Sequence, residues 1–129
     1  MITNEQIMPL LLQASPSFSG PWEEHLKDWQ GEIPPLYPSI GLFAHHVVAL
    51  WARGKTEDFP RIFDVVEDLH LKGDEKVREA ATIGVLESLQ NISGNRGLDP
   101  EVFFPFLKPE SARWWIRLND FWQGKRPRV

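Results

Sequence analysis

Histidine and carboxylate side chains are the first candidates for chemistry in this chain, and the sequence contains no cysteine. Disulfides, thiolate metal sites and cysteine nucleophiles are therefore excluded. Glu67 and His70 form one Glu-x-x-His step, and His46 could supply a third ligand. Carboxylate-bridged di-iron bundles need that step twice. A small metal-binding or hydrolytic enzyme that uses His46, Glu67 and His70 is thus an alternative hypothesis for this chain.

The helical phase of each histidine favours structural roles. At about 100° per residue, His45 points away from the apolar stripe of its helix and His46 lies on the flank of that stripe. His70 falls near the centre of an apolar face and near the C-terminus of its helix, where the helix dipole favours the protonated form. We expect His45 to be exposed and His70 to be buried and hydrogen-bonded.

Other catalytic signatures are missing from the sequence. It contains no Gly-x-Ser-x-Gly nucleophile motif and no Gly-x-x-x-x-Gly-Lys phosphate loop. Most of the six tryptophans lie on helical stripes beside aliphatic residues, which predicts core packing. Trp115 lies to one side of the stripe of Trp114, Leu118 and Phe121, so we expect it to be exposed to a partner. The leading prediction contains no catalytic residue, cofactor or metal.

The formal net charge of −4 is unevenly distributed along the chain. Residues 57–101 hold 11 acidic and 5 basic residues, whereas residues 110–129 hold 2 acidic and 5 basic residues. An acidic middle repels nucleic-acid phosphates and attracts a basic protein surface. Helical wheels place five carboxylates on the outer faces of two neighbouring helices: Glu57, Asp64, Asp68, Glu75 and Glu79. We expect them to form one patch that binds a basic partner, with no nucleic-acid binding.

The helices that carry these carboxylates are the clearest elements in the sequence. Apolar residues recur at helical spacing in the first helix, and the second opens at Asp74, a favoured N-cap residue. Gly73 separates the two, and we expect it to adopt a positive φ, as glycine commonly does after a helix. Several residues of the second helix match the pattern of the HEAT repeat: Asp74, Val77, Arg78, Ala81 and Leu86. The pair, residues 56–92, resembles one HEAT-type helical hairpin.

Turn residues divide the rest of the chain into further helices. The predicted helices cover residues 3–14, 21–31, 39–54, 99–104 and 109–124. Pro9 predicts a kink, the prolines of residues 32–38 predict an extended connector, and the glycines of residues 91–98 predict a loop. No segment alternates between apolar and polar residues over five or more positions, so no sheet is expected.

The sequence therefore predicts an all-α fold. We expect a single domain over residues 1–124, built as a bundle of about six antiparallel helices, and a disordered basic tail at residues 125–129. No apolar run approaches the roughly 18–20 residues that span a bilayer. The first residues also lack the basic start of a secretory signal. A cytoplasmic protein that does not bind membranes is expected.

Four segments carry a resemblance that spans most of the chain. They are GLFAHHVVALW (41–51), FDVVEDLHL (63–71), IGVLESLQN (83–91) and residues 109–122, which contain PES and WW. Together they resemble a family of small uncharacterised bacterial helical domains. Small acidic bacterial proteins of this kind are often toxin-neutralising immunity proteins or accessory proteins of toxin systems. By this analogy of size, charge and fold class, the resemblance implies a similar role.

The leading functional hypothesis is a non-enzymatic protein-binding module, with a bacterial immunity protein as its most specific version. The acidic helical face would dock onto a basic partner and occlude it, with aromatic anchors such as Trp115. The metal-binding or hydrolytic enzyme is one alternative. A structural, oligomeric helical protein without a discrete ligand is another.

Overall fold

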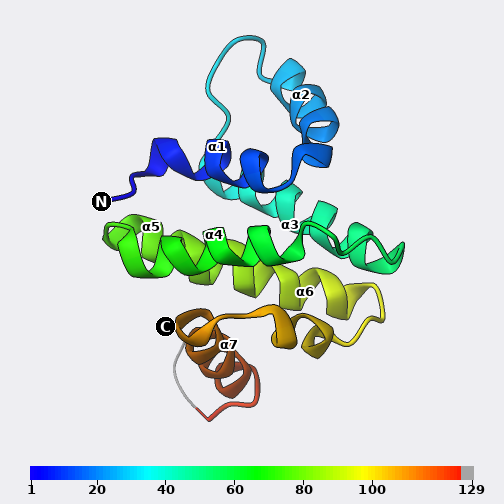
Figure 1. Cartoon of the computed structure of the whole chain (residues 1–129), viewed down its shortest axis with the longest axis vertical. Helices are drawn as coiled ribbons and strands as arrows, with labels where there is room; N and C mark the ends of the chain where they lie inside the picture. The colour runs from blue at the N-terminus through cyan, green and yellow to red at the C-terminus, as the bar shows by residue number, and fades with distance from the viewer. Residues whose placement is uncertain (126–129) are drawn as a thin grey trace.

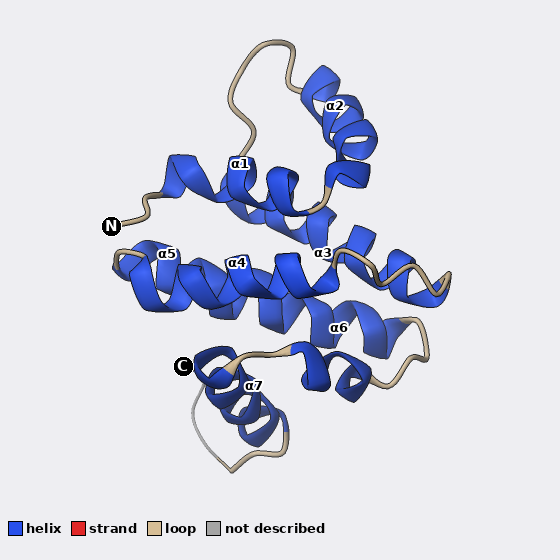
Figure 2. Cartoon of the chain, in the orientation of Figure 1, coloured by secondary structure: helices blue, strands red, loops and turns tan. Residues whose placement is uncertain are grey.

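The computed structural model describes residues 1–125, which form helices joined by loops (Figures 1 and 2). In chain order the elements are α1 (Asn4–Ala14), the 3-10 helix η1 (Pro16–Phe18), α2 (Ser19–Asp28), α3 (Leu36–Ala52), α4 (Phe59–Lys72), α5 (Glu75–Glu79), the π-helical η2 (Ala80–Leu86), α6 (Glu87–Asn95), the 3-10 helix η3 (Pro100–Phe106) and α7 (Pro109–Trp122). This part of the chain contains no sheet, so the predicted all-α bundle is confirmed. Residues 126–129, where most of the predicted tail falls, lie outside the described residues.

The hairpin of α4 and α5 turns at Gly73, but not through the expected positive φ. Gly73 has φ −79° and ψ 156°, an extended conformation that any residue can adopt. A Cβ atom at this position would lie 2.4 Å from the carbonyl oxygen of Leu69 and 2.4 Å from Val77 Cγ1. Glycine is therefore required by a close approach between the two helices. Ile2 pairs with the same turn, because its N–H donates to Lys72 O and its carbonyl accepts from Asp74 N.

Residues 75–95 run as one long helix whose middle is π-helical. Asp74 caps its start, since its Oδ1 accepts from Val77 N at 2.9 Å. The central segment η2 packs against α3, α4 and α7. Gly84 allows the close approach of α3, because a Cβ there would lie 3.2 Å from Ile40 side-chain carbons. The expected second helix of the hairpin is confirmed, although nothing in its periodicity predicted the π-helical turn.

The hydrophobic core lies between α1, α3, α4, the long helix and α7. The α3 helix packs against α6, whereas α4 packs against α1 on one side and α7 on the other. Rings from two elements meet in an aromatic cluster: Phe59, Phe63, Phe103 and Phe106. Figure 1 shows α1 and α2 at one end of the long axis of the molecule and α7 at the opposite end.

The α2 helix departs from the prediction that its aromatic face packs into the core. It has no fully buried residue, although Trp22 is half-buried and packs at the edge of the core, with its ring centroid 6.1 Å from that of Phe18. The connector that follows extends to residue 35, and Ile33 within it is 93% exposed. We refer to α2 together with residues 29–35 as the α2 arm, which stands away from the rest of the bundle in Figure 1.

Two helix boundaries differ from the predictions. The α3 helix begins at Leu36, before the expected Ser39, because proline is tolerated in a first helical turn. Ser39 is buried there and donates its hydroxyl to Pro35 O at 2.8 Å. The α6 helix continues to Asn95, through part of the predicted loop. None of the helices in residues 1–125 combines the length and apolar character needed to span a membrane.

Candidate functional site

His70 lies at the junction of α4, η2 and α7, where it is 4% exposed. Its Nδ1 is 3.0 Å from both Val66 O and Ser111 Oγ, and its Nε2 is 3.0 Å from Thr82 Oγ1. A carbonyl oxygen only accepts, so Nδ1 carries a proton, and Nε2 lies beside the Thr82 hydroxyl, whose oxygen is also within 3.3 Å of Arg78 O. The prediction that His70 is buried and hydrogen-bonded is confirmed.

Glu67 lies one turn before His70 and caps α7 from outside that helix. Its Oε2 accepts from Glu110 N at 3.0 Å, and its Oε1 accepts from Ser111 N at 2.9 Å and Ser111 Oγ at 2.8 Å. Burial acts to raise the pKa of Glu67, but these hydrogen bonds and the nearby His70 outweigh it, so the pKa lies below its usual value. The carboxylate also interacts favourably with the dipole of α7. Glu67 therefore fixes the start of α7 against α4.

Burial lowers the pKa of His70. The carbonyl of Val66 and the carboxylates of Glu67 and Glu110 act in the opposite direction, but the pKa still lies below its ordinary value. The neutral imidazole is therefore favoured at neutral pH. The dipole of α4 was expected to favour the protonated form, but the loss of water around the buried ring has the larger effect on the pKa of His70.

His46 does not join Glu67 and His70. Its Nε2 lies 2.9 Å from Ser17 Oγ and its ring packs 5.4 Å from that of Phe18, on the side of α3 that faces η1. Burial, and secondarily the charge of Arg53, lowers the pKa of His46. Within residues 1–125 no group of three His, Asp or Glu side chains is placed to hold a metal ion. The grouping of all three residues is contradicted, because Glu67 and His70 both contact Ser111 whereas His46 contacts Ser17 and Phe18.

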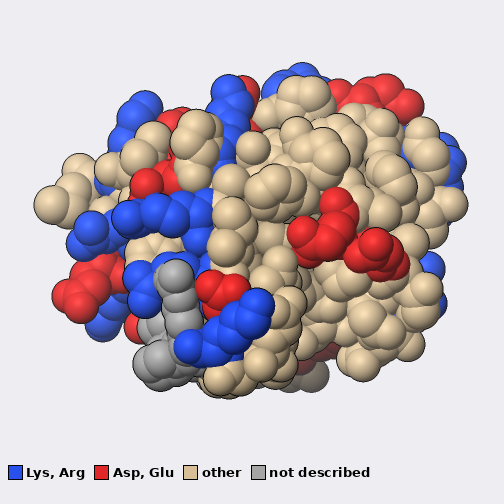
Figure 3. Space-filling model, turned by 90° about the horizontal axis from the view of Figure 1, so that it is seen from below, with Lys and Arg blue, Asp and Glu red and all other residues tan. Residues whose placement is uncertain are grey.

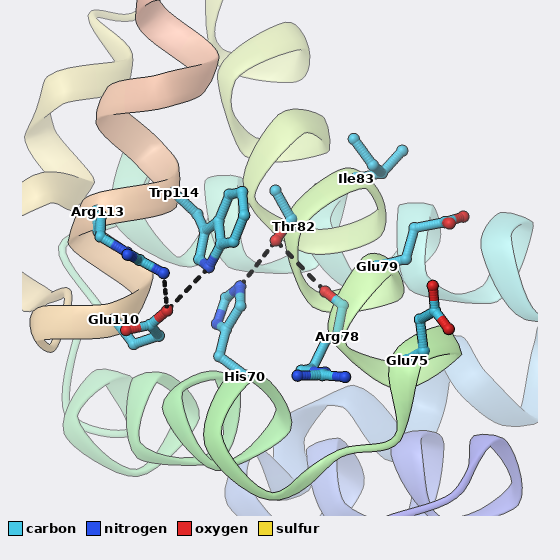
Figure 4. Close-up of a pocket in the computed structure, with 9 residues that line it drawn as sticks. All are labelled: His70, Glu75, Arg78, Glu79, Thr82, Ile83, Glu110, Arg113 and Trp114. Atoms are coloured by element: carbon cyan, nitrogen blue, oxygen red, sulfur yellow. Dashed lines mark hydrogen bonds and ion pairs between the residues drawn. The ribbon is translucent and has the colours of Figure 1, made fainter. Parts of the chain in front are cut away.

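A cavity of about 310 Å³ opens beside His70 (Figure 4). We call it the junction cavity, and its lining residues come from α4, the long helix and α7: His70, Glu75, Arg78, Glu79, Thr82, Ile83, Glu110, Arg113 and Trp114. In Figure 4, His70, Thr82 and Trp114 lie together on one side, and Glu75 and Glu79 lie on the other. The π-helical turn supplies Thr82, which links the cavity wall to the buried hydrogen bonds of His70.

The α7 wall of the junction cavity is internally neutralised. Arg113 donates to Glu110 Oε1 at 2.7 Å, and Trp114 Nε1 donates to the same oxygen at 3.1 Å. The guanidinium carbon atoms of Arg113 and Arg117 lie 5.3 and 5.0 Å from the centroid of the Trp114 ring. These contacts hold Trp114 in one orientation at the edge of the cavity.

The α5 wall keeps charges that no nearby ion neutralises. Glu75 and Arg78 are exposed and form no ion pair with another residue in the described part of the chain. Glu79 is also exposed and accepts a hydrogen bond from the Tyr37 hydroxyl at 2.9 Å. A single hydrogen bond leaves the charge of Glu79 in place, so this wall carries two carboxylates and one guanidinium.

The other predicted acidic residues have different neighbours. Asp64 pairs with Lys108 at 2.7 Å, an interaction that raises the pKa of Lys108, and Asp68 pairs with Lys72 at 3.5 Å. Glu57 is exposed just before α4. Lysines therefore interrupt the expected patch, and only Glu75 and Glu79 of the five residues line the junction cavity.

Trp115 is not exposed, which corrects the prediction for it. Its side chain is fully buried, and its Nε1 donates to Glu101 Oε2 at 2.8 Å. The neighbouring Trp114 lies at the cavity instead. The helical stripe on α7 was predicted around Trp114, whereas the true core face is centred on Trp115 and Leu118. Arg78 and Thr82 were not singled out as site residues, because only the fold brings them beside α7.

The comparisons with known proteins identify a family. Residues 8–123 match the family described as a domain of unknown function (DUF7674). Neither the curated proteins nor the solved structures gave a significant match. The match covers nearly the whole described chain, including α3, the hairpin and the junction cavity. The protein thus belongs to the DUF7674 family.

Proposed function

We propose that the protein is a non-enzymatic protein-binding module whose junction cavity receives a basic side chain of its partner. One observation carries the proposal: Glu75 and Glu79, two of the acidic residues singled out in the sequence, line this cavity together. Arg113 is already bonded to Glu110, so among the described residues that line the cavity Arg78 is the one guanidinium without an ion pair. The remaining charge is negative and favours a cation.

The apolar part of the cavity suits the stem of a lysine or arginine. Ile83 and the indole of Trp114 lie beside the carboxylates, and the methylenes of a basic side chain pack well on such surfaces while the charged head stays polar. His70 and Thr82, which are buried and hydrogen-bonded, keep the adjoining wall in one conformation. A rigid pocket that takes one anchor residue is the usual centre of a protein interface.

Binding at this cavity would occlude the surface of the partner that carries the basic residue. Glu57 lies outside the cavity, where its charge would speed the approach of a basic protein. The specific version of the proposal is a cytoplasmic immunity protein of bacterial type, built on a HEAT-like hairpin, whose partner is a basic toxin. The resemblance described above supports this version by analogy only.

The test is affinity capture from a lysate of the source organism, with elution by a salt gradient and identification of the captured proteins. We compare the wild-type protein with the double variant Glu75→Gln/Glu79→Gln. The wild-type protein is expected to capture a basic protein that elutes as salt rises, because screening weakens exposed charge pairs. The double variant is expected to bind the same protein roughly tenfold less tightly, as is usual when an interface anchor is lost.

The matched control is Asp64→Asn/Asp68→Asn, which removes the same charge from carboxylates that already pair with lysines. This variant is expected to retain most of the binding, measured by calorimetry with the purified partner. Equal losses in the two variants would show that net charge, and not the cavity, controls binding. Capture that is unchanged in Glu75→Gln/Glu79→Gln would contradict the proposal.

A further inference from the structure

A second cavity, distinct from the junction cavity, lies between the α2 arm and the body. It has a volume of about 390 Å³, and we call it the arm groove. Its lining is mainly apolar, comes from α1, the arm and the start of α3, and includes Met8, Trp22, Ile33 and Leu36. Ile33 is 93% exposed, and α2 buries none of its residues. The arm groove is therefore an apolar surface that the rest of the described chain leaves uncovered.

The segment that forms most of the arm groove is acidic. Residues 1–35 hold 5 acidic residues and 1 basic residue, a formal charge of −4 that equals the net charge of the whole chain. Glu5 lies in the lining, and the other carboxylates of this segment are exposed on the α2 arm. Asn4 Oδ1 also lies at the groove, where it is buried without a hydrogen-bond partner in the described residues. The groove therefore suits an apolar side chain that is flanked by cations and N–H donors.

The outer face of α7 has the complementary character. Ile116 is 49% exposed and lies one turn from Arg113 and next to Arg117. Arg117 makes no ion pair with another residue among 1–125, and its Nε is buried without a hydrogen-bond partner. Lys125, just beyond the helix, is exposed. In Figure 3, which looks at the α7 end of the molecule, the Lys and Arg side chains on the left side of the surface lie among Asp and Glu side chains.

We propose that the arm groove of one molecule receives the outer face of α7 from a second copy of this chain. Ile116 would enter beside Ile33, Met8 and Trp22, while Arg117 and Lys125 would meet the carboxylates of the α2 arm. The attraction combines apolar burial with opposite charges, and the two surfaces belong to the same chain. This association does not rest on the binding function proposed for the junction cavity.

The placement of the two surfaces determines the kind of assembly. The arm groove and α7 lie at opposite ends of the long axis of the molecule (Figure 1). Joining one end to the other uses two different patches, so each added molecule presents a new groove and a new α7 face. Such a head-to-tail contact leads to rings or open chains rather than to a closed twofold dimer.

The first test is sedimentation equilibrium of the purified protein from micromolar to millimolar concentration. The average mass is expected to rise beyond that of a dimer, and to fall again when salt screens the charges. Two variants at exposed positions should each reduce the association roughly tenfold: Ile33→Asn in the groove and Ile116→Asp on α7. A wild-type protein that stays monomeric up to millimolar concentration would overturn the proposal.

Mixing the two variants gives a sharper test. The Ile33→Asn chain keeps an intact α7 face, and the Ile116→Asp chain keeps an intact groove. At a concentration where each variant alone is monomeric, their mixture is expected to form a one-to-one dimer that grows no further. A mixture that remains monomeric, or a wild-type oligomer that neither variant weakens, would show that these two surfaces do not bind each other. Circular dichroism of each variant checks that its helices are intact.

Discussion

The junction between α4 and α7 and the α2 arm are both places where a helix joins the body of this protein, yet they are held differently. At the junction, Glu67 and His70 bind the start of α7 through buried hydrogen bonds. The α2 arm has no buried residue, and its side-chain hydrogen bonds to α3 involve Ser39 Oγ, which lies 3.2 Å from His25 Nε2 and donates to Pro35 O at 2.8 Å. The junction is therefore a polar contact that holds α7 in the fold, whereas the α2 arm leaves apolar surface exposed.

The largest expected effect tests the hydrogen-bonded junction between α4 and α7. Glu67→Ala removes the acceptor for two backbone N–H groups and one hydroxyl of α7, at Glu110 and Ser111. Buried donors without partners should lower the free energy of unfolding by about 3 kcal/mol. Urea denaturation measures this change. Glu24→Ala, at an exposed position on the α2 arm, is the control and should change it by less than about 0.5 kcal/mol. Similar losses in both variants would remove the distinction.

Two glycines, one in the packed body and one in the α2 arm, test the same comparison through substitutions at the backbone. Gly73→Ala should lower the free energy of unfolding by about 2 kcal/mol, because the added Cβ would overlap Leu69 O and Val77 in a packed joint. Gly31, in the α2 arm, has φ +86° and open space around it. Gly31→Ala should therefore reduce stability by only about 1 kcal/mol, through strain at positive φ. Thermal unfolding measures the stability lost by each variant. A larger loss in Gly73→Ala than in Gly31→Ala would show that overlap of the added Cβ costs more than backbone strain.

The pH dependence of stability gives the next effect. The folded-state pKa of His70 lies below its ordinary value of 6.5, so the unfolded chain takes up a proton first as the pH falls. The contribution of the neutral His70 to the free energy of unfolding should be fully present above pH 6.5 and should be lost as the pH falls below it. A further loss is expected below pH 4.5, where Glu67 begins to protonate in the unfolded chain. His46 acts in the same direction as His70, because its pKa is also lowered.

Denaturation at a series of pH values between 4.5 and 6.5 measures the histidine contribution. The slope of the free energy of unfolding against pH should be reduced in His70→Gln and reduced further when His46→Gln is added. His45→Gln, at an exposed position of α3, is the control for the effect of the substitution on stability itself. If the slope is unchanged in the variant that lacks both His46 and His70, other groups cause the loss of stability at acid pH.

The smallest expected effect lies in the α2 arm. Leu26 is 36% exposed, so Leu26→Ala should change the free energy of unfolding by less than about 0.5 kcal/mol. Leu118→Ala, at a fully buried leucine of α7, should lower it by about 3 kcal/mol through loss of apolar burial and a cavity. Chemical denaturation of both variants makes the comparison. A large loss in Leu26→Ala would mean that the α2 arm contributes to the cooperative fold.

Local patterns predicted most of the fold. Asp74 and Asp99 cap helices as their sequence positions indicated, and the apolar spacing of α4 predicted its buried face, including His70. The same reasoning failed for Trp115, because helical phase alone does not tell which neighbour covers a helix. The hydrogen bond between Thr82 and His70 depends on the π-helical turn, and no local signal of residue type predicted that turn.

The candidate site was predicted in part. Glu75 and Glu79 were correctly expected to be exposed, and the structure places them at the junction cavity. Sequence spacing could not show that Asp64 would meet Lys108, 44 positions further along the chain and in front of another helix. Such pairings depend on tertiary packing, and they decide which of several similar carboxylates remain available.

The π-helical turn η2 has a consequence for how the long helix can change during evolution or engineering. A π-helical turn accommodates one residue more than an α-helical turn, so it is equivalent to a single-residue insertion. Each residue turns an α-helix by about 100°, which means that the insertion rotates α6 relative to α5 by that amount. One continuous helix can thereby present α5 to α4 and the junction cavity while it presents α6 to α3 and η3. Deleting one residue within 80–86 would restore a regular helix whose two halves no longer face both sets of neighbours.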